Sequence, residues 1–168
     1  MRRMDRVLDI APFTWTAVLT ALVCGVIVGL ERQLRGKPVG IRTSTLITLG
    51  TYAFIALAIS VSNQVSDPSR IIGQVVTGIG FLGAGVMLAR DGIVVGVTSA
   101  ATIWAMAAIG VCIALGFHLT AIKLAVVVVA ILYGVDLLEN TSSAMTRGVH
   151  ARYTGWRSRG KNPYNNQE

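Results

Sequence analysis

The sequence predicts an all-α membrane protein, a helical bundle of about five transmembrane helices, and three observations lead to this prediction. The 168 residues are 53% hydrophobic and only 14% charged, whereas soluble domains carry about 25% charged residues. The apolar residues gather in runs that reach or approach the roughly 20 residues needed to cross a bilayer. The charged residues stand between and after those runs, a pattern typical of membrane orientation and not of nucleic-acid binding.

Five segments are expected to be helices, because a segment in lipid has to satisfy its backbone hydrogen bonds internally. The predicted spans are Phe13–Leu30, Thr45–Ser62, Ile71–Ala89, Ser99–Phe117 and Leu119–Leu138. The first run shows no small-residue cleavage site, so we expect it to remain as a span. The chain then divides into a transmembrane domain, residues 1–140, and a basic polar tail, residues 141–168, whose composition predicts mobility.

Two features mark the ends of the later spans. Asp67 is placed to cap the third helix, and Pro68 suits its first position. His118 lies in the tight turn between the fourth and fifth spans, where an interfacial polar residue is a plainer reading than a metal ligand. Lys123 follows one turn later and can extend back to the same interface.

The third span is unusually rich in glycine. Gly78, Gly80, Gly83 and Gly85 fall within the run GIGFLGAG. Each interior glycine would cost a soluble helix roughly 1 kcal/mol relative to alanine, but in a membrane small residues let helix backbones approach closely. We therefore expect this helix to pack tightly, either inside the bundle or across a homodimer.

The chain also repeats itself weakly at a spacing of 56 residues, since Gly29, Gly36 and Gly40 map onto Gly85, Gly92 and Gly96. The repeat would relate the first two spans to the next two as parallel helical hairpins, as in some transport folds. Chance similarity in a glycine-rich chain is an equal alternative. Sites in such folds lie where the two halves meet.

Charged residues stand where the first span ends and the second begins. Glu31 and Arg32 end the first span, and Arg42 and Thr43 open the second. A carboxylate beside several guanidinium groups is expected to pair with one of them, because arginine can bind a carboxylate through two parallel bonds. The pair would be either a clamp that fixes the first hairpin or a polar gate that contacts an ion.

Uncharged polar residues recur within the spans, where they would either join helices or line a hydrated path. They are Thr48, Thr51, Gln74, Thr77, Thr102 and, with its indole N–H, Trp104. The middle thirds of the first four spans carry no charge, which argues against a proton relay or a substrate carrier. Asp136 and Glu139 share a helix face and could attract a divalent cation, although a solvated helix end is the simpler interpretation.

The basic residues predict the orientation of the chain. Ten lie in the loops after the first and third spans and in the tail, whereas Arg2, Arg3, Arg6 and Arg70 lie on the other side. We expect the larger group in the cytoplasm, with the N-terminus outside and the C-terminus inside.

Three segments resemble the MgtC/SapB family of bacterial inner-membrane proteins. They are GLERQLRGKPVGIRTSTLITLG (Gly29–Gly50), DPSRIIGQVVTGIGFLGAGVML (Asp67–Leu88) and VTSAATIWAMAAIG (Val97–Gly110). The resemblance implies a multi-helix membrane domain linked to magnesium homeostasis, acid stress or survival inside host cells. The positions that match its motifs are Glu31, Arg32, Arg42, Thr43, Asp67, Arg70, Gly78, Gly80, Gly83, Gly85, Thr102 and Trp104.

The longer members of that family carry a soluble domain after the last helix, whereas here only the polar tail follows, as in the short SapB-like members. We expect a non-enzymatic protein without a cofactor, which acts in the lipid bilayer by binding or regulating a membrane-protein partner and forms a homodimer. The alternative is a transporter or channel for an ion such as magnesium, with a path between the helical hairpins. The sequence identifies no metal ligands.

Overall fold

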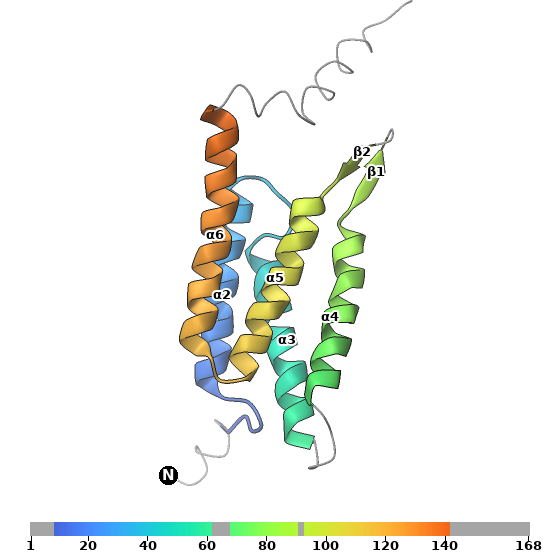
Figure 1. Ribbon diagram of the computed structural model, residues 1–168. Coiled ribbons are helices and arrows are strands. Elements are labelled where there is room, and N and C mark those ends of the chain that lie inside the picture. Colours follow the sequence, from blue (N-terminus) through green and yellow to red (C-terminus); the bar gives the residue numbers. More distant parts are fainter. Residues whose placement is uncertain (1–8, 62–67, 91–92, 142–168) are drawn as a thin grey trace, which may run out of the picture. The chain divides into compact units, whose positions relative to one another are not determined.

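The computed structural model describes residues 9–61, 68–90 and 93–141, and within them the chain forms five α-helices and one small β-hairpin (Figure 1). The helices are α2 (Trp15–Leu34), α3 (Ile41–Val61), α4 (Pro68–Gly85), α5 (Val97–Ala114) and α6 (His118–Thr141). The predicted all-α membrane bundle is confirmed. Four of the helices, α2, α3, α5 and α6, are long and apolar enough to cross a membrane.

The helix α4 is shorter and more polar than the sequence analysis predicted. It has 18 residues and ends at Gly85, not at Ala89, and it is not among the four helices that meet the length and apolarity of a span. Arg70, Gln74 and its many glycines lower its hydropathy.

An unpredicted antiparallel hairpin follows α4. Strand β1 (Leu88–Arg90) pairs with β2 (Ile93–Val95), with Ala89 opposite Val94. The β-branched run Ile93-Val94-Val95 favours extended structure, and Gly96, at a φ of 93°, then turns the chain into α5. This connection replaces the end of the predicted third span.

The helices α2 and α3 form a close antiparallel hairpin. The Thr14 side chain caps α2 by accepting a bond from the Ala17 N–H, and the Thr14 N–H donates to the Tyr52 hydroxyl at 2.9 Å, which ties the start of α2 to α3. At its other end α2 runs through Leu34, four residues beyond the predicted limit of the span. The chain then turns at Gly36, with a φ of 62°, and enters α3 at Ile41.

The tightest helix contacts are made at glycines that the sequence analysis did not assign to helix packing. A Cβ at Gly29 would lie 2.7 Å from the Ile41 N and closer still to its Cα, and a Cβ at Gly25 would overlap Thr45 in the same way. A Cβ at Gly110 in α5 would lie 2.7 Å from the Thr48 carbonyl oxygen. These glycines let α2 and α5 approach the backbone of α3, as small residues do in membrane bundles.

The glycines of α4 do not play this part within the chain. Among the described residues, no atom of another element lies within 4 Å of a Cβ built at Gly78, Gly80 or Gly85. A Cβ built at Gly83 would lie 3.6 Å from the Ala100 Cβ of α5, an ordinary van der Waals distance. The expectation of tight packing by α4 inside the bundle is therefore wrong for three of its four glycines, and packing across a homodimer stays a prediction.

The two predicted hairpins are present, as α2 with α3 and α4 with α5, and successive helices alternate in direction (Figure 1). Their connections differ, however, because a short loop joins the first pair and the β-hairpin joins the second. Gly29 and its counterpart Gly85 also differ, since only Gly29 meets a neighbouring backbone. Any duplication has thus diverged at the points where the helices meet.

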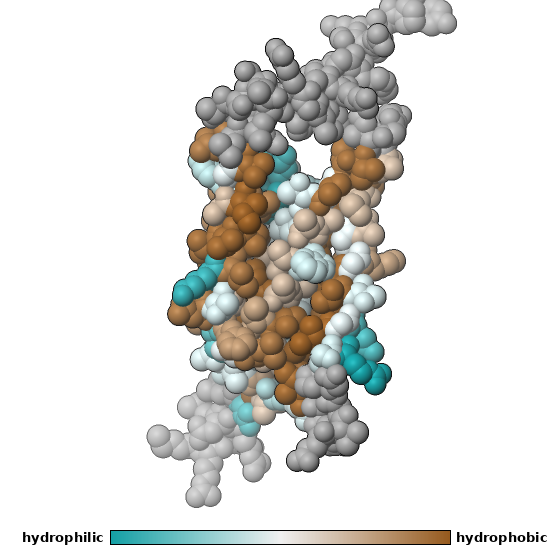
Figure 2. Space-filling view, viewed as in Figure 1, coloured by the Kyte–Doolittle hydropathy of each residue, from teal (hydrophilic) through white to brown (hydrophobic). Residues whose placement is uncertain are grey.

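The core lies where α2, α3 and α5 pack together, and small residues let large ones interlock there. Ala21 and Cys24 of α2, Ile55 of α3, and Met106 and Ile109 of α5 are almost completely buried. In contrast Leu19, Leu46 and Phe81 are more than 60% exposed. This apolar exterior, brown in Figure 2, is the surface of a protein that faces lipid.

The chain divides into two compact units, residues 1–129 and 130–168. In the first unit, α6 begins at His118, which is half-buried, and buries Ala121 and Ala125 completely, while Lys123 is exposed. In the second unit, the described residues continue α6 to Thr141. Asp67, the charged N-terminus, the tail and the Glu139 side chain lie outside the part that the structure describes.

Candidate functional site

A buried polar cluster, made by Glu31, Arg32 and Arg35 with Ser99, is the candidate site. Glu31 and Arg32 lie in the last turn of α2 and are only 9% and 4% exposed. The helix α2 continues past the predicted end of the span, so both residues are helical, and the Arg32 side chain reaches the start of α5. Ser99, in the first turn of α5, is 2% exposed.

Arg32 joins two helices that are far apart in the sequence. Its Nη2 donates a hydrogen bond of 2.7 Å to the Ser99 Oγ, across 67 residues of chain. A bond with an ionised donor is shorter and stronger than a neutral one, and a buried guanidinium is costly without a partner. Arg32 therefore fixes the end of α2 against the start of α5.

Glu31 forms an ion pair with Arg35, one helical turn later. The Arg35 Nε lies 2.7 Å from the Glu31 Oε1, and the two side chains are 26% and 8% exposed. Within the described residues, neither carboxylate oxygen accepts a hydrogen bond of good geometry. Glu31 is thus a buried, ion-paired carboxylate whose oxygens can still accept a hydrogen bond or contact a cation. The clamp between helices is the Arg32–Ser99 bond, which joins α2 to α5.

Three threonine hydroxyls within the helices donate to their own helix and not to a neighbouring one. Thr48, Thr77 and Thr102 each donate to the carbonyl four residues earlier, at 3.0, 2.9 and 2.8 Å. Ser44 donates to the Val39 carbonyl at 3.1 Å, just before α3. Because the preceding turn already satisfies these donors, Thr48, Thr77 and Thr102 do not donate to another helix among the described residues, and a role in lining a hydrated path stays a prediction.

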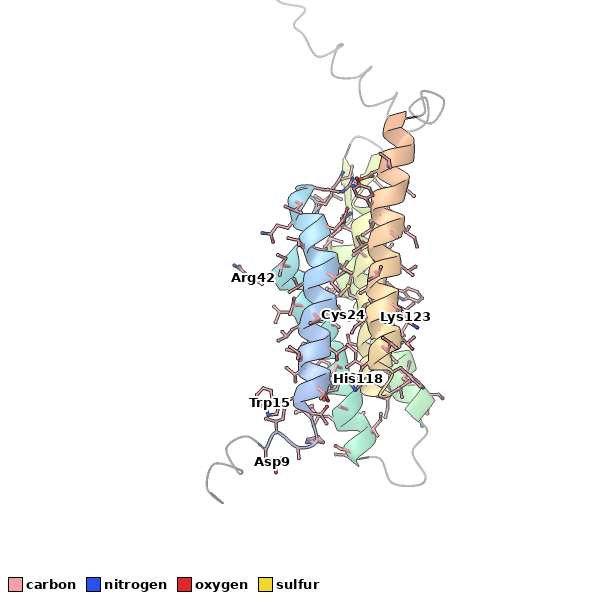
Figure 3. The ribbon with its side chains drawn as sticks, turned by 90° about the vertical axis from the view of Figure 1, so that its left-hand side faces the viewer. Asp9, Trp15, Cys24, Arg42, His118 and Lys123 are labelled. Carbon is pink, nitrogen blue, oxygen red and sulfur yellow. The ribbon has the colours of Figure 1, made fainter. Side chains whose placement is uncertain are left out.

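The other predicted residues lie outside the polar cluster. Arg42 and Thr43 are exposed at the start of α3, and Figure 3 shows Arg42 pointing away from α2. Arg70 and Gln74 are exposed on α4, and Trp104 of α5 is 56% exposed. Among the described residues of the predicted polar set, only Glu31 and Arg32 belong to the polar cluster.

Sequence reasoning missed the two partners that complete the cluster. Arg35 follows Glu31 by four residues, the spacing at which helix side chains meet, so a helix extended past Leu30 would have revealed the pair. Ser99 carries no such signal, because its contact depends on how α5 packs against α2. Among the described residues, no group of three His, Cys, Asp or Glu side chains is placed to hold a metal ion, and both cysteines are free thiols.

The fold and this site define a polytopic α-helical membrane protein whose buried ionic groups, Glu31 and Arg32, lie at one end of a tightly packed three-helix core. The family model of the MgtC family matches residues 18–141, so the chain belongs to the MgtC family. That match runs from the first turn of α2 to the end of α6 and includes the whole polar cluster.

Curated relatives match the same region. The "Putative magnesium transporter YhiD" of Escherichia coli K12 is 45% identical over 115 residues, which are 64% of this chain and 53% of that protein. "Protein MgtC" of Salmonella typhimurium is 39% identical over 111 residues, 66% of this chain and 47% of that protein. "Protein MgtC" of Brucella abortus (strain 2308) is 43% identical over 91 residues, 54% of this chain and 38% of that protein. The chain spans about half the length of these relatives, and no solved structure matches it.

Proposed function

We propose that this chain is a non-enzymatic inner-membrane protein that helps a bacterium adapt to magnesium limitation or acid by binding a membrane partner. The observation that carries the proposal is that the core hydroxyls of Thr48 and Thr102 donate to carbonyls of their own helices, together with the position of the charges. Glu31, Arg32 and Arg35 lie at one end of α2, and Val97–Ala114, the span they clamp, carries no charge. Such a bundle is built to be rigid and to present surfaces.

The surface we assign to self-assembly is the small-residue face of α4, made by Gly73, Thr77, Gly80 and Ala84. All four are exposed, and their spacings of four, three and four residues place them on one side of the helix. Thr77 turns its hydroxyl back to the Gly73 carbonyl, which leaves this side smooth. Small faces of this kind support close helix association in lipid, so a second copy of the chain is the proposed occupant.

The link to magnesium follows from the family and from the printed name of the Escherichia coli relative. It remains a proposal for this chain, because the match covers 53% of that protein. The proposed orientation keeps the N-terminus outside and the C-terminus in the cytoplasm, which places the polar cluster and the exposed Lys37 on the cytoplasmic side, as the positive-inside rule favours.

The second candidate function is ion transport between the two hairpins. It is favoured by the spare acceptor capacity of Glu31, since a buried carboxylate oxygen suits a hard cation. It would require a hydrated path through a core in which the Thr48 and Thr102 hydroxyls already donate to their own helices, although the buried Thr45 hydroxyl has no partner among the described residues.

Magnesium flux into proteoliposomes distinguishes the two functions. The purified chain is reconstituted around a trapped magnesium indicator, and the proposal expects uptake no faster than in protein-free liposomes. Uptake that Glu31→Gln abolishes and the exposed-residue control Gln74→Ala retains would establish the transporter and overturn the proposal.

A further inference from the structure

An open groove between α3 and α4 lies apart from both the polar cluster and the small-residue face. Its volume is about 480 Å³, within the range of about 300–1,000 Å³ that small-molecule sites occupy. Its walls are apolar along most of their length, with Leu46, Ile47 and Phe54 on α3 and Val75, Ile79 and Leu82 on α4.

Two glycines keep this groove open. Gly50 of α3 and Gly78 of α4 both line it, and among the described residues no atom lies within 4 Å of a Cβ built at either one. The side of α4 at Gly83 faces Ala100 of α5, so α4 packs on α5 and leaves space on its side toward α3. The glycine that the sequence analysis assigned to helix packing, Gly78, thus borders empty volume.

One end of the groove is polar and positively charged. Arg42 and Thr43 line that end, and both are exposed. Arg42 makes no hydrogen bond or ion pair with any residue that the structure describes. The connection just before it carries Lys37, also exposed. An anion that reached this end would find a guanidinium with all its donors available, the group best suited to bind a phosphate through two bonds.

The length of the groove matches half a bilayer. Arg42 and Phe54 are separated by twelve residues of α3, a rise of about 18 Å at the helical 1.5 Å per residue. The hydrocarbon of one leaflet is about 15 Å deep, half of the whole core. A molecule with one anionic group at the level of Arg42 and an apolar chain reaching Phe54 would fill the groove from the interface to the bilayer midplane.

We propose that the groove binds one acyl chain of an anionic phospholipid, with the headgroup phosphate held by the Arg42 guanidinium and the Thr43 hydroxyl. A single cation at the end of an apolar channel is complementary to an amphiphile and not to a polar peptide or a free sugar. The inference goes beyond the proposed function and does not depend on it. The groove is lined by Val75, Ile79 and Leu82, whose spacing places them on the opposite side of α4 from the small-residue face.

The test is native mass spectrometry of the purified full chain, released from detergent after incubation with phosphatidylglycerol or with phosphatidylcholine of the same acyl chains. The wild type is expected to retain one phosphatidylglycerol per chain and to prefer it over phosphatidylcholine, whose choline ammonium offsets the phosphate charge that Arg42 would bind. Arg42→Gln should lower that preference about fivefold, the ratio that accompanies one interfacial arginine, whereas Arg70→Gln, an exposed arginine on α4 outside the groove, should leave it unchanged.

Two further variants test the apolar part of the site. Gly78→Leu and Gly50→Leu fill the groove from opposite walls, and each should abolish retention of the lipid. Gly134→Leu makes the same change at an α6 glycine with nothing within 4 Å among the described residues and should retain it. Equal retention of the two lipids by the wild type, or full retention in both groove variants, would overturn the proposal. Loss of dimers in the groove variants with lipid retention intact would assign the groove to a second copy and would overturn it as well.

Discussion

The substitution Gly29→Ala tests most sharply how the α2–α3 hairpin is held together. The new Cβ would lie 2.7 Å from the Ile41 N, about 0.7 Å short of the 3.4 Å at which ordinary contact begins, and closer still to the Ile41 Cα. Both atoms belong to the backbone, so no side-chain rotation relieves the overlap and the helices have to separate.

The expected cost follows from two opposing effects. Overpacking a well-packed site costs about 1–3 kcal/mol, and a clash with backbone belongs at the upper end of that range. Replacing a helical glycine by alanine returns up to about 1 kcal/mol of helix propensity. The free energy of unfolding should therefore fall by about 1–2 kcal/mol in Gly29→Ala.

The matched control is Gly78→Ala, where no described atom lies within 4 Å of the new Cβ. There only the propensity effect acts, so stability should stay unchanged or rise by up to about 1 kcal/mol. The assay is equilibrium unfolding of the detergent-solubilised protein with SDS, followed by circular dichroism. Equal free energies of unfolding for the two variants would refute the reasoning, because they would show that α2 and α3 do not depend on the absent side chain.

Three other predictions concern the polar cluster and the small-residue face. Ser99→Ala removes the Arg32 partner and should lower the free energy of unfolding by about 1.5–3 kcal/mol, whereas Ser60→Ala, at an exposed position, should change it by less than about 0.5 kcal/mol. Arg35→Gln should lower the free energy of unfolding by about 1–3 kcal/mol, less than the loss of a fully buried pair because Arg35 is partly exposed. Adding Glu31→Gln should restore most of that stability. A double variant as unstable as Arg35→Gln alone would exclude the ion pair as the cause. Gly80→Leu should weaken self-association in analytical ultracentrifugation while leaving the circular dichroism of the monomer unchanged, and an unaltered dimer would remove the small-residue face from the account.

The sequence predicted the fold class because apolar run length and backbone satisfaction in lipid leave few alternatives. It misplaced the helix ends wherever the chain remained helical among polar residues. Glu31 through Leu34 extend α2 past the apolar run, and Ile41 begins α3 before it. Hydropathy alone does not locate these helix ends, because a helical turn with charged residues is stabilised by contacts with other helices, such as the bond from Arg32 to Ser99.

The positions of the glycines in the sequence also failed to predict which helices pack closely. Glycine content marked α4 as the packing helix, but the close approaches are at Gly25, Gly29 and Gly110. A lone glycine in a span carries little signal, and whether it meets a neighbouring backbone depends on the rotation of both helices about their axes. The β-hairpin from Leu88 to Val95 was also missed, because a short apolar segment next to a helix reads as its continuation.

The candidate site was predicted in part for a physical reason. A carboxylate next to arginines at a membrane boundary has to be paired, so Glu31 and Arg32 were identified from the sequence. Their partners depended on geometry, since Arg35 required a longer helix and Ser99 required the contact between α2 and α5. Arg42 was grouped with them by its nearness in sequence, yet it points away from α2 (Figure 3).

The most direct test of the account is disulfide cross-linking at the small-residue face in native membranes. Cys24 and Cys112 are first replaced by alanine, and a single cysteine is introduced by Thr77→Cys or, on an exposed position of α6, by Val126→Cys. Mild oxidation should convert the Thr77→Cys chain to covalent dimers and leave the Val126→Cys chain monomeric. A Thr77→Cys chain that stays monomeric under the same oxidation would contradict the claim that this protein assembles through α4.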